Sequence, residues 1–211
     1  MSEIVFIITA AHNVSEDNNV LRERFIEYMI ALHKVFSYNK PVYGVLSEYN
    51  EKRQHVPPFD NFPFTMKKIL KDELNLCKTK SQKEFLSVQY LIKDMNIDDD
   101  TFIIKVTGRY VILKDILIDS VEKNKTNKNI NAIICLAKGV YPIQQCTFLF
   151  AMRWKWFKKF YELSINDLGN KCLERFIIEF IQNEKLEVSI INLDELGILT
   201  HINNENKFEL Y

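Results

Sequence analysis

The segment FIIKVTGRYVIL, residues 102–113, places cationic and hydroxyl side chains inside an apolar run. A strand turns successive side chains to opposite faces, so Lys105, Thr107 and Arg109 would share one face. A guanidinium matches phosphate oxygens, an ammonium adds a point charge, and a hydroxyl adds a hydrogen bond. Gly108 lacks the side chain that would keep a ligand away from the backbone. This pattern predicts a cradle for a diphosphate.

The same residues have a purely structural alternative. A buried charge without a partner is costly, so Lys105 and Arg109 must either be paired or reach solvent. An internal salt bridge to a carboxylate such as Glu174 would satisfy that requirement equally well. The sequence leaves both interpretations open.

A second polar group, formed by Thr9, His12 and Asn13, follows the apolar run IVFIIT at residues 4–9. Ligands of open α/β sheets bind at the carboxyl ends of the strands. We therefore expect this group to line the same crevice as Thr107 and to contact the base and ribose of a nucleotide. Ordinary loop and helix-cap roles are the alternative for all three residues.

Glu174 is the candidate general base. It lies in KCLERFIIEFI, in the first turn of an expected helix, where the helix dipole favours a carboxylate. A carboxylate there would remove a proton from a hydroxyl group. The alternative is a surface acid that only stabilises the helix.

For two further clusters we favour a structural role over a functional one. In RWKWFKKF the aromatic residues, among them Trp154 and Phe157, could stack on sugars or bases, but they equally form the apolar face of a basic helix. The acidic triplet 98–100 resembles a metal site, yet it precedes its strand and so belongs at the opposite edge of the sheet. A solvated turn is the expectation for the triplet.

These residues must be positioned by alternating strands and helices, which predict an α/β sheet flanked by helices. We expect strands at residues 4–9, 41–47, 102–113, 130–137, 145–152 and 186–193, and helices at 21–36, 79–95, 114–124, 153–163 and within 169–183. Ser81 and Glu84 suggest a capping box for the second helix. Residues 48–63 read as a long loop, and the polar tail from residue 203 is expected to fray.

Composition narrows the class of protein. The 211 residues are 47% apolar and carry no net charge, so no overall field attracts nucleic acid. No apolar run reaches the roughly 20 residues of a membrane span, and the first residues read as a strand instead of a signal peptide. Neither the four cysteines nor the four histidines show metal-ligand spacing, and no glycine-rich phosphate loop is present. A cytoplasmic, single-domain protein spanning residues 1–211 is the expectation.

Taken together, LCKTKSQKE, DDDTFIIKVTGRY and FAMRWKWFKKFY resemble small glycosyltransferase-like proteins of large DNA viruses and bacterial polysaccharide clusters. The specific part is the shared Lys-x-Thr-Gly-Arg-Tyr strand. The resemblance implies a GT-A-like, Rossmann-type mixed sheet. It also implies transfer of a sugar from a nucleotide-sugar donor, most readily a UDP-sugar, to a hydroxyl of a glycan acceptor with inversion.

The resemblance also assigns roles to residues. The residues that would bind the nucleotide sugar are Thr9, His12, Asn13, Lys105, Thr107, Gly108 and Arg109. Glu174 would be the catalytic base, and Met152 and Arg153 would border the acceptor.

The chain departs from most GT-A enzymes because it lacks an Asp-x-Asp pair on the 102–113 segment. The need for manganese or magnesium is therefore open, and a carboxylate elsewhere, such as Asp60, would have to hold a metal. Two rival functions remain: a non-catalytic nucleotide- or glycan-binding module, and a nucleotidyltransferase.

Overall fold

The computed structural model describes residues 3–11, 18–49, 59, 62–108, 110–136, 145–192, 195, 198–202 and 207–210. The strands are β1 (Ile4–Ala11), β2 (Val42–Tyr49), β3 (Thr65–Leu70), β4 (Phe102–Thr107), β5 (Val111–Ile112), β6 (Ala132–Leu136), β7 (Gln145–Arg153), β8 (Val188–Asn192), β9 (Ile198–Ile202) and β10 (Lys207–Leu210). The helices are α1 (Asn18–Ser37), η2 (Lys71–Leu74), α2 (Lys80–Ile92), α3 (Ile116–Asn124), α4 (Trp154–Tyr161), α5 (Ile165–Leu168) and α6 (Leu173–Asn183).

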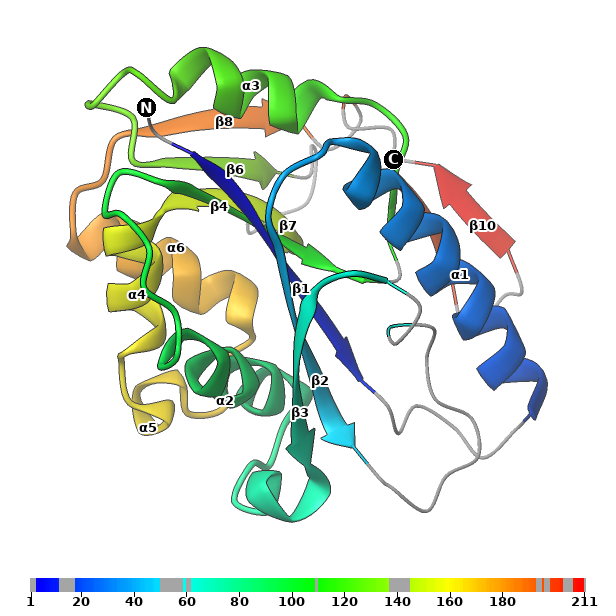
Figure 1. Ribbon diagram of the computed structural model, residues 1–211. Coiled ribbons are helices and arrows are strands. Elements are labelled where there is room, and N and C mark those ends of the chain that lie inside the picture. The colour runs from blue at the N-terminus through cyan, green and yellow to red at the C-terminus, as the bar shows by residue number, and fades with distance from the viewer. Residues whose placement is uncertain are drawn as a thin grey trace.

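The predicted α/β class is confirmed by a seven-stranded mixed sheet. Its strand order is β3-β2-β1-β4-β7-β6-β8, and β7 alone in this sheet runs antiparallel to its neighbours. Figure 1 shows helices on both faces of the sheet. Seven of the eight residues of β1 are buried, as expected for a central strand covered on both sides.

Two hydrophobic cores lie on opposite faces of this sheet. One contains side chains of α1 and α3, such as Leu32 and Val121, and the other contains side chains of α2, α4, α5 and α6. Alternate residues of β4 divide between them: Val106 belongs to the α1/α3 core, and Ile103 belongs to the α2/α4/α6 core. The side chain of Lys105 therefore points towards α2.

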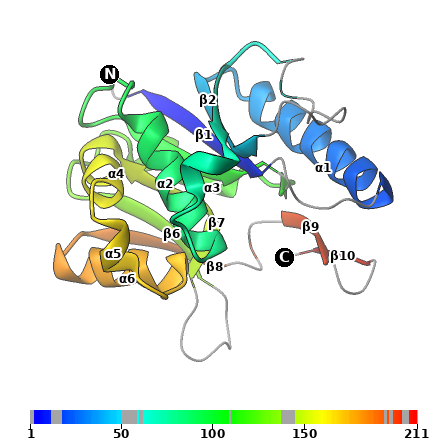
Figure 2. The same ribbon diagram turned by 90° about the horizontal axis from the view of Figure 1, so that it is seen from below.

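The segment 102–113 is not one strand. β4 ends at Thr107, where the amide of Tyr110 donates to the Thr107 carbonyl at 3.0 Å and closes a turn. β5 then joins β9 and β10 in a small antiparallel sheet. Figure 2 shows β9 and β10 apart from the seven-stranded sheet. The same pairing overturns the expected fraying of the tail at residues 207–210.

The start of α2 also differs from the sequence prediction. Its N-cap is Thr79, whose hydroxyl accepts a hydrogen bond from the Gln82 amide at 3.1 Å, and the Gln82 side chain completes the capping box. The Ser81–Glu84 capping box is therefore wrong by two residues. Glu84 lies in the second turn of the helix, where its carboxylate is available for contacts with the sheet.

The aromatic segment 153–160 and the acidic triplet 98–100 have the structural roles expected of them. Trp154 and Phe157 are buried in the core, and the Trp156 indole donates to the Asn131 side chain at 2.8 Å. Asp98 and Asp99 are exposed in the turn before β4. Within the part of the chain that the structure describes, none of the helices has the length and apolar character that a membrane crossing requires.

Candidate functional site

The carboxyl ends of β1 and β4 bring two predicted site residues together. Thr9 of β1 is paired with Thr107 of β4, and Ile7 is paired with Lys105 in the same parallel register. Adjacent strands lie about 4.8 Å apart, so side chains at paired positions are neighbours on one face. Thr9 is buried, and Thr107 is partly exposed. Lys105 lies on the same face two residues before Thr107, further from the carboxyl edge of the sheet.

The ammonium group of Lys105 is fully buried and forms an ion pair with Oε1 of Glu84, a residue of α2. It also donates to the Thr107 hydroxyl at 3.1 Å. The Thr9 hydroxyl donates to the same Glu84 oxygen at 3.2 Å. These four residues, Thr9, Glu84, Lys105 and Thr107, are called the edge cluster below. Glu84 connects the cluster to solvent, since 29% of its side chain is exposed.

The salt-bridge alternative therefore describes Lys105, and Glu84 is an acid that pairs with it. A fully buried ammonium that touches a carboxylate is not placed to contact a diphosphate. The costly desolvation of the lysine is offset inside the protein.

Gly108 is required for a different reason than the one the sequence suggests. A β-carbon at this position would lie 2.9 Å from Ile8 and 3.2 Å from the Tyr28 ring, both on the α1 side of the sheet. Its amide donates to the Thr9 carbonyl at 2.8 Å. The missing side chain makes room for the packing of α1 and leaves no observed gap for a ligand.

Several candidates fall outside the described residues. His12, Asn13 and Arg109, proposed to bind the nucleotide, and Asp60, considered for a metal, are in this group. Their predicted roles stay predictions.

A second ion pair lies at the same edge. Glu48, near the end of β2, pairs at 2.5 Å with Lys83, the neighbour of Glu84 on α2. Glu48 has a φ of 56°, an unfavourable conformation for a residue with a side chain, and the β2–β3 register shifts beside it. Backbone strain of this kind is concentrated at functional sites.

The topology places Glu174 at the carboxyl edge as well. α6 precedes β8, which runs parallel to β6 and begins opposite Ala132, the first residue of β6. An 11-residue helix spans about 16 Å, so α6 begins towards the carboxyl edge of the sheet. The Gln82 side chain, in the first turn of α2, donates to the Gly169 carbonyl just before α6 at 2.7 Å. The partly buried Glu174 is the second residue of α6.

Met152 and Arg153 lie at the other edge of the sheet. Because β7 is antiparallel to β4, Arg153 is paired with Phe102, the first residue of β4. Met152 is fully buried in the core beneath α4 and α6. Neither residue is placed to border an acceptor at the carboxyl edge, which corrects the assignment made by resemblance.

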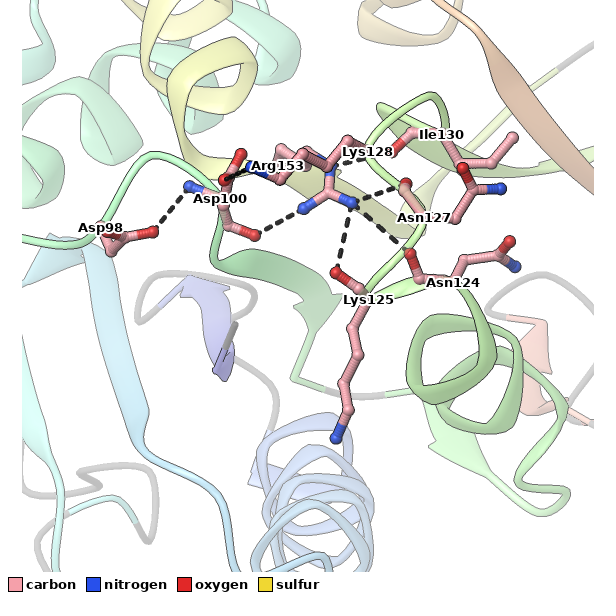
Figure 3. Close-up of polar contacts among 8 residues, drawn as sticks. All are labelled: Asp98, Asp100, Asn124, Lys125, Asn127, Lys128, Ile130 and Arg153. Atoms are coloured by element: carbon pink, nitrogen blue, oxygen red, sulfur yellow. Dashed lines mark hydrogen bonds and ion pairs between the residues drawn. The ribbon is translucent and has the colours of Figure 1, made fainter. Parts of the chain in front are cut away.

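The guanidinium of Arg153 is enclosed by backbone carbonyl groups, as Figure 3 shows. Its three nitrogens donate to the carbonyls of Asp100, Asn124, Lys125, Asn127 and Ile130 at 2.7–3.4 Å. Its carbon also lies 4.5 Å from the centre of the Phe102 ring. Burial lowers the pKa of this guanidinium, and the charge of Asp100 opposes that shift. Arg153 therefore ties the turn before β4 to the segment after α3.

No group of three histidine, cysteine or acidic residues that could hold a metal is found among the residues that the structure describes. Glu48 and Glu84, two of the carboxylates at this edge, each contact a lysine.

Sequence reasoning missed Glu84 because a capping-box role already accounted for it. The available signal was the buried cation itself: Lys105 needed an acid, and Glu84 is the acid at one end of a helix that leads directly into β4. The helix before a parallel strand begins at the strand's carboxyl edge, so its first turns are the place to look for that acid.

No protein-family model and no curated protein sequence matches this chain. Solved structures match its fold. A candidate nucleotide-diphospho-sugar transferase from Desulfovibrio desulfuricans aligns with a TM-score of 0.58 and 11% identity, over 91% of this chain and 80% of that protein. The fold therefore resembles that of nucleotide-diphospho-sugar transferases.

Two nucleotidyltransferase structures are similar to the same degree. A candidate glucose-1-phosphate thymidylyltransferase from Bacillus anthracis has a TM-score of 0.60 and 12% identity, over 90% of this chain and 86% of that protein. The 4-diphosphocytidyl-2C-methyl-D-erythritol synthase of Anaerococcus prevotii has a TM-score of 0.56 and 13% identity, over 90% of this chain and 89% of that protein. At these identities the likeness establishes the fold.

Proposed function

We propose that this chain is a single-domain glycosyltransferase that moves a sugar from a nucleotide-sugar donor, a UDP-sugar by preference, to a hydroxyl of a glycan acceptor. The observation that carries the proposal is the shared position of Thr9, Thr107 and Glu174 at the carboxyl edge of the sheet. In open α/β sheets this edge is where ligands bind. A structurally similar protein carries the name of a nucleotide-diphospho-sugar transferase.

In the proposed reaction Glu174 removes the proton of the acceptor hydroxyl. The hydroxyl oxygen attacks the anomeric carbon of the donor sugar, and the bond from that carbon to the diphosphate oxygen breaks. The nucleoside diphosphate leaves with the bonding electron pair, and the anomeric centre inverts. Arg109, as predicted from the sequence, would supply fixed positive charge to the departing diphosphate. Whether manganese or magnesium assists is decided by assays with and without the ion.

The first test is Glu174→Gln, assayed by release of nucleoside diphosphate from nucleotide sugars in the presence of glycan acceptors. Loss of a general base is expected to lower kcat by about 10²- to 10⁴-fold. Binding of the donor, measured by calorimetry, should be unchanged because the glutamine keeps the shape of the side chain.

The matched control is Glu179→Gln, five residues further along α6. Glu179 pairs with Lys171 and Arg175 on the surface, and its replacement should leave kcat within about twofold. If both variants transfer sugar like the wild type, Glu174 is not the base.

Nucleotidyl transfer is the second candidate, since two of the similar structures carry nucleotidyltransferase names. That reaction joins a sugar phosphate to a nucleoside triphosphate and releases pyrophosphate, whereas glycosyl transfer releases a nucleoside diphosphate. Assaying both products in parallel, with and without manganese, separates the two. Binding of nucleotide with neither product would support the non-catalytic binding module.

A further inference from the structure

The charge balance of the edge cluster restricts what it can bind. Glu84 reaches the surface while the ammonium of Lys105 contacts it from below, so the pair is neutral overall. A phosphate would meet the exposed carboxylate, and a divalent cation would meet the nearby ammonium. A neutral ligand group that forms hydrogen bonds escapes both repulsions.

The hydrogen bonds already made define the kind of group that fits. Glu84 uses Oε1 for both Thr9 and Lys105, so within the described part of the chain its Oε2 accepts no hydrogen bond. The Thr107 oxygen accepts from Lys105, and its own O–H has no acceptor there. A carboxylate offers about four acceptor sites and a hydroxyl one donor. The cluster thus presents one acceptor and one donor on two residues that contact the same ammonium, and two neighbouring hydroxyl groups would complement them.

The cluster is held in position before any ligand arrives. Lys105 is fully buried under the sheet surface, and Thr9 is nearly so. The Thr79 cap and the bond from Gln82 to the Gly169 carbonyl fix the first turn of α2, which precedes Glu84. Preorganised groups of this kind bind a ligand without a further ordering cost.

We propose that Glu84 and Thr107 bind two adjacent hydroxyl groups of the nucleotide sugar, with Glu84 accepting and Thr107 donating. Lys105 and Thr9 are positioning residues that hold the Glu84 carboxylate. This inference rests on the proposed nucleotide-sugar function and specifies its ligand chemistry. The diol belongs either to the ribose or to the transferred sugar, and the binding probes below separate these sources.

The experiment is calorimetry on the full chain. ADP, CDP, GDP and UDP are compared first, and the tightest binder is then tested against its 2′-deoxy and 3′-deoxy forms. The nucleoside diphosphate glucose of the same base is then compared with the nucleoside diphosphate 2-deoxyglucose, which lacks the 2-hydroxyl of the sugar. Because a site built around a hydroxyl rejects an analogue without it, the wild type should prefer one intact ligand by about tenfold or more. If binding weakens when a ribose hydroxyl is removed, the diol belongs to the ribose. If it weakens only when the sugar hydroxyl is removed, the diol belongs to the transferred sugar.

The decisive variant is the double replacement Glu84→Gln with Lys105→Met, which removes both charges of the buried pair together. It should reduce the preference to below about threefold. The matched control is Lys40→Met with Glu122→Gln, which neutralises another ion pair of 2.8 Å and should keep the preference. Circular dichroism establishes that each variant is folded.

Thr107→Val is the second variant, needed if the double replacement does not fold. It keeps the ion pair, removes the donor and should weaken the preference in the same assay. The inference is overturned if the wild type shows no preference for any intact ligand, or if folded variants keep the wild-type preference. If none of the four nucleoside diphosphates binds, the proposed function itself fails, and this inference fails with it.

Discussion

Lys105 and Arg153 are both cations buried in the same sheet, yet the protein treats them differently. Their exposed fractions are 0% and 1%, and they lie at opposite ends of β4, since Arg153 is paired with Phe102. Lys105 forms an ion pair with Glu84, a carboxylate that reaches solvent. Arg153 is enclosed by five backbone carbonyl groups.

The difference shows how a buried charge can serve structure or a binding surface. The carbonyls around Arg153 come from two chain segments that the guanidinium joins, and that contact is internal. The partner of Lys105 is a side chain, and Glu84 retains an oxygen that accepts no bond from the described residues. Only the Lys105 arrangement leaves hydrogen-bonding capacity at the surface where ligands are expected.

The largest effect is expected for Arg153→Met. It would leave several buried carbonyls without donors, each costing about 1–3 kcal/mol, so the free energy of unfolding should fall by about 4 kcal/mol or more. Urea unfolding measures this loss. Lys128→Met is the control, because Lys128 is 84% exposed and its replacement should stay within about 0.5 kcal/mol. A loss below about 1 kcal/mol for Arg153→Met would show that Arg153 does not have the structural role assigned to it here.

A smaller, reversible effect is expected at the other cation. Glu84→Gln leaves Lys105 buried without its acid and should lower the free energy of unfolding by about 2–3 kcal/mol, less than a fully sealed pair because Glu84 is partly solvated. Adding Lys105→Met should recover most of that loss in the same urea titration. No recovery in the double variant would mean that Lys105 has partners as numerous as those of Arg153.

The smallest effect concerns Tyr161, whose hydroxyl is fully buried and has no hydrogen-bond partner among the described residues. Tyr161→Phe removes that unsatisfied group and should raise the free energy of unfolding by up to about 1 kcal/mol at pH 7. A loss of stability instead would show that the hydroxyl takes part in the polar network around Glu84.

The same variant has a signature at alkaline pH. Burial, together with the charge of Glu84, raises the pKa of Tyr161 well above its ordinary value of 10.0. Above pH 10 the unfolded chain loses this proton while the folded chain keeps it, so wild-type stability should fall by about 1.4 kcal/mol per pH unit for this group. In urea titrations between pH 10 and 11, Tyr161→Phe should make that decline shallower by about 1 kcal/mol, because the unfolded tyrosine is only half ionised at pH 10.

The sequence predicted the sheet-and-helix class because hydrophobic periodicity reports burial directly, as in β1 and in the apolar face of α4. It missed β3, where only Ile69 of six residues is buried, because an edge strand carries little apolar signal. It also missed the turn after Thr107, since the apolar residues beyond Gly108 continue the pattern of a strand while belonging to another sheet.

The candidate site was predicted in part for a similar reason. Thr9 and Thr107 were placed at one edge by the rule that parallel strands end together, and the pairing of β1 with β4 agrees with that placement. The position of Glu174 at the same edge was not predicted and follows from the direction of β8. Arg153 was misplaced because the antiparallel direction of β7 depends on its neighbours and leaves no mark in its own composition.

By itself, the sequence determined that a charged strand had to lie inside an α/β protein and that its lysine needed a partner. Only the tertiary structure decided which partner that is, because Glu84 and Lys105 are 21 residues apart and meet through the packing of α2 on the sheet. Helical periodicity fixes the face on which a carboxylate lies, but the strand beneath that face is set by how helix and sheet pack. The outcome is a surface carboxylate whose charge is balanced from below, and this balance decides what it can bind.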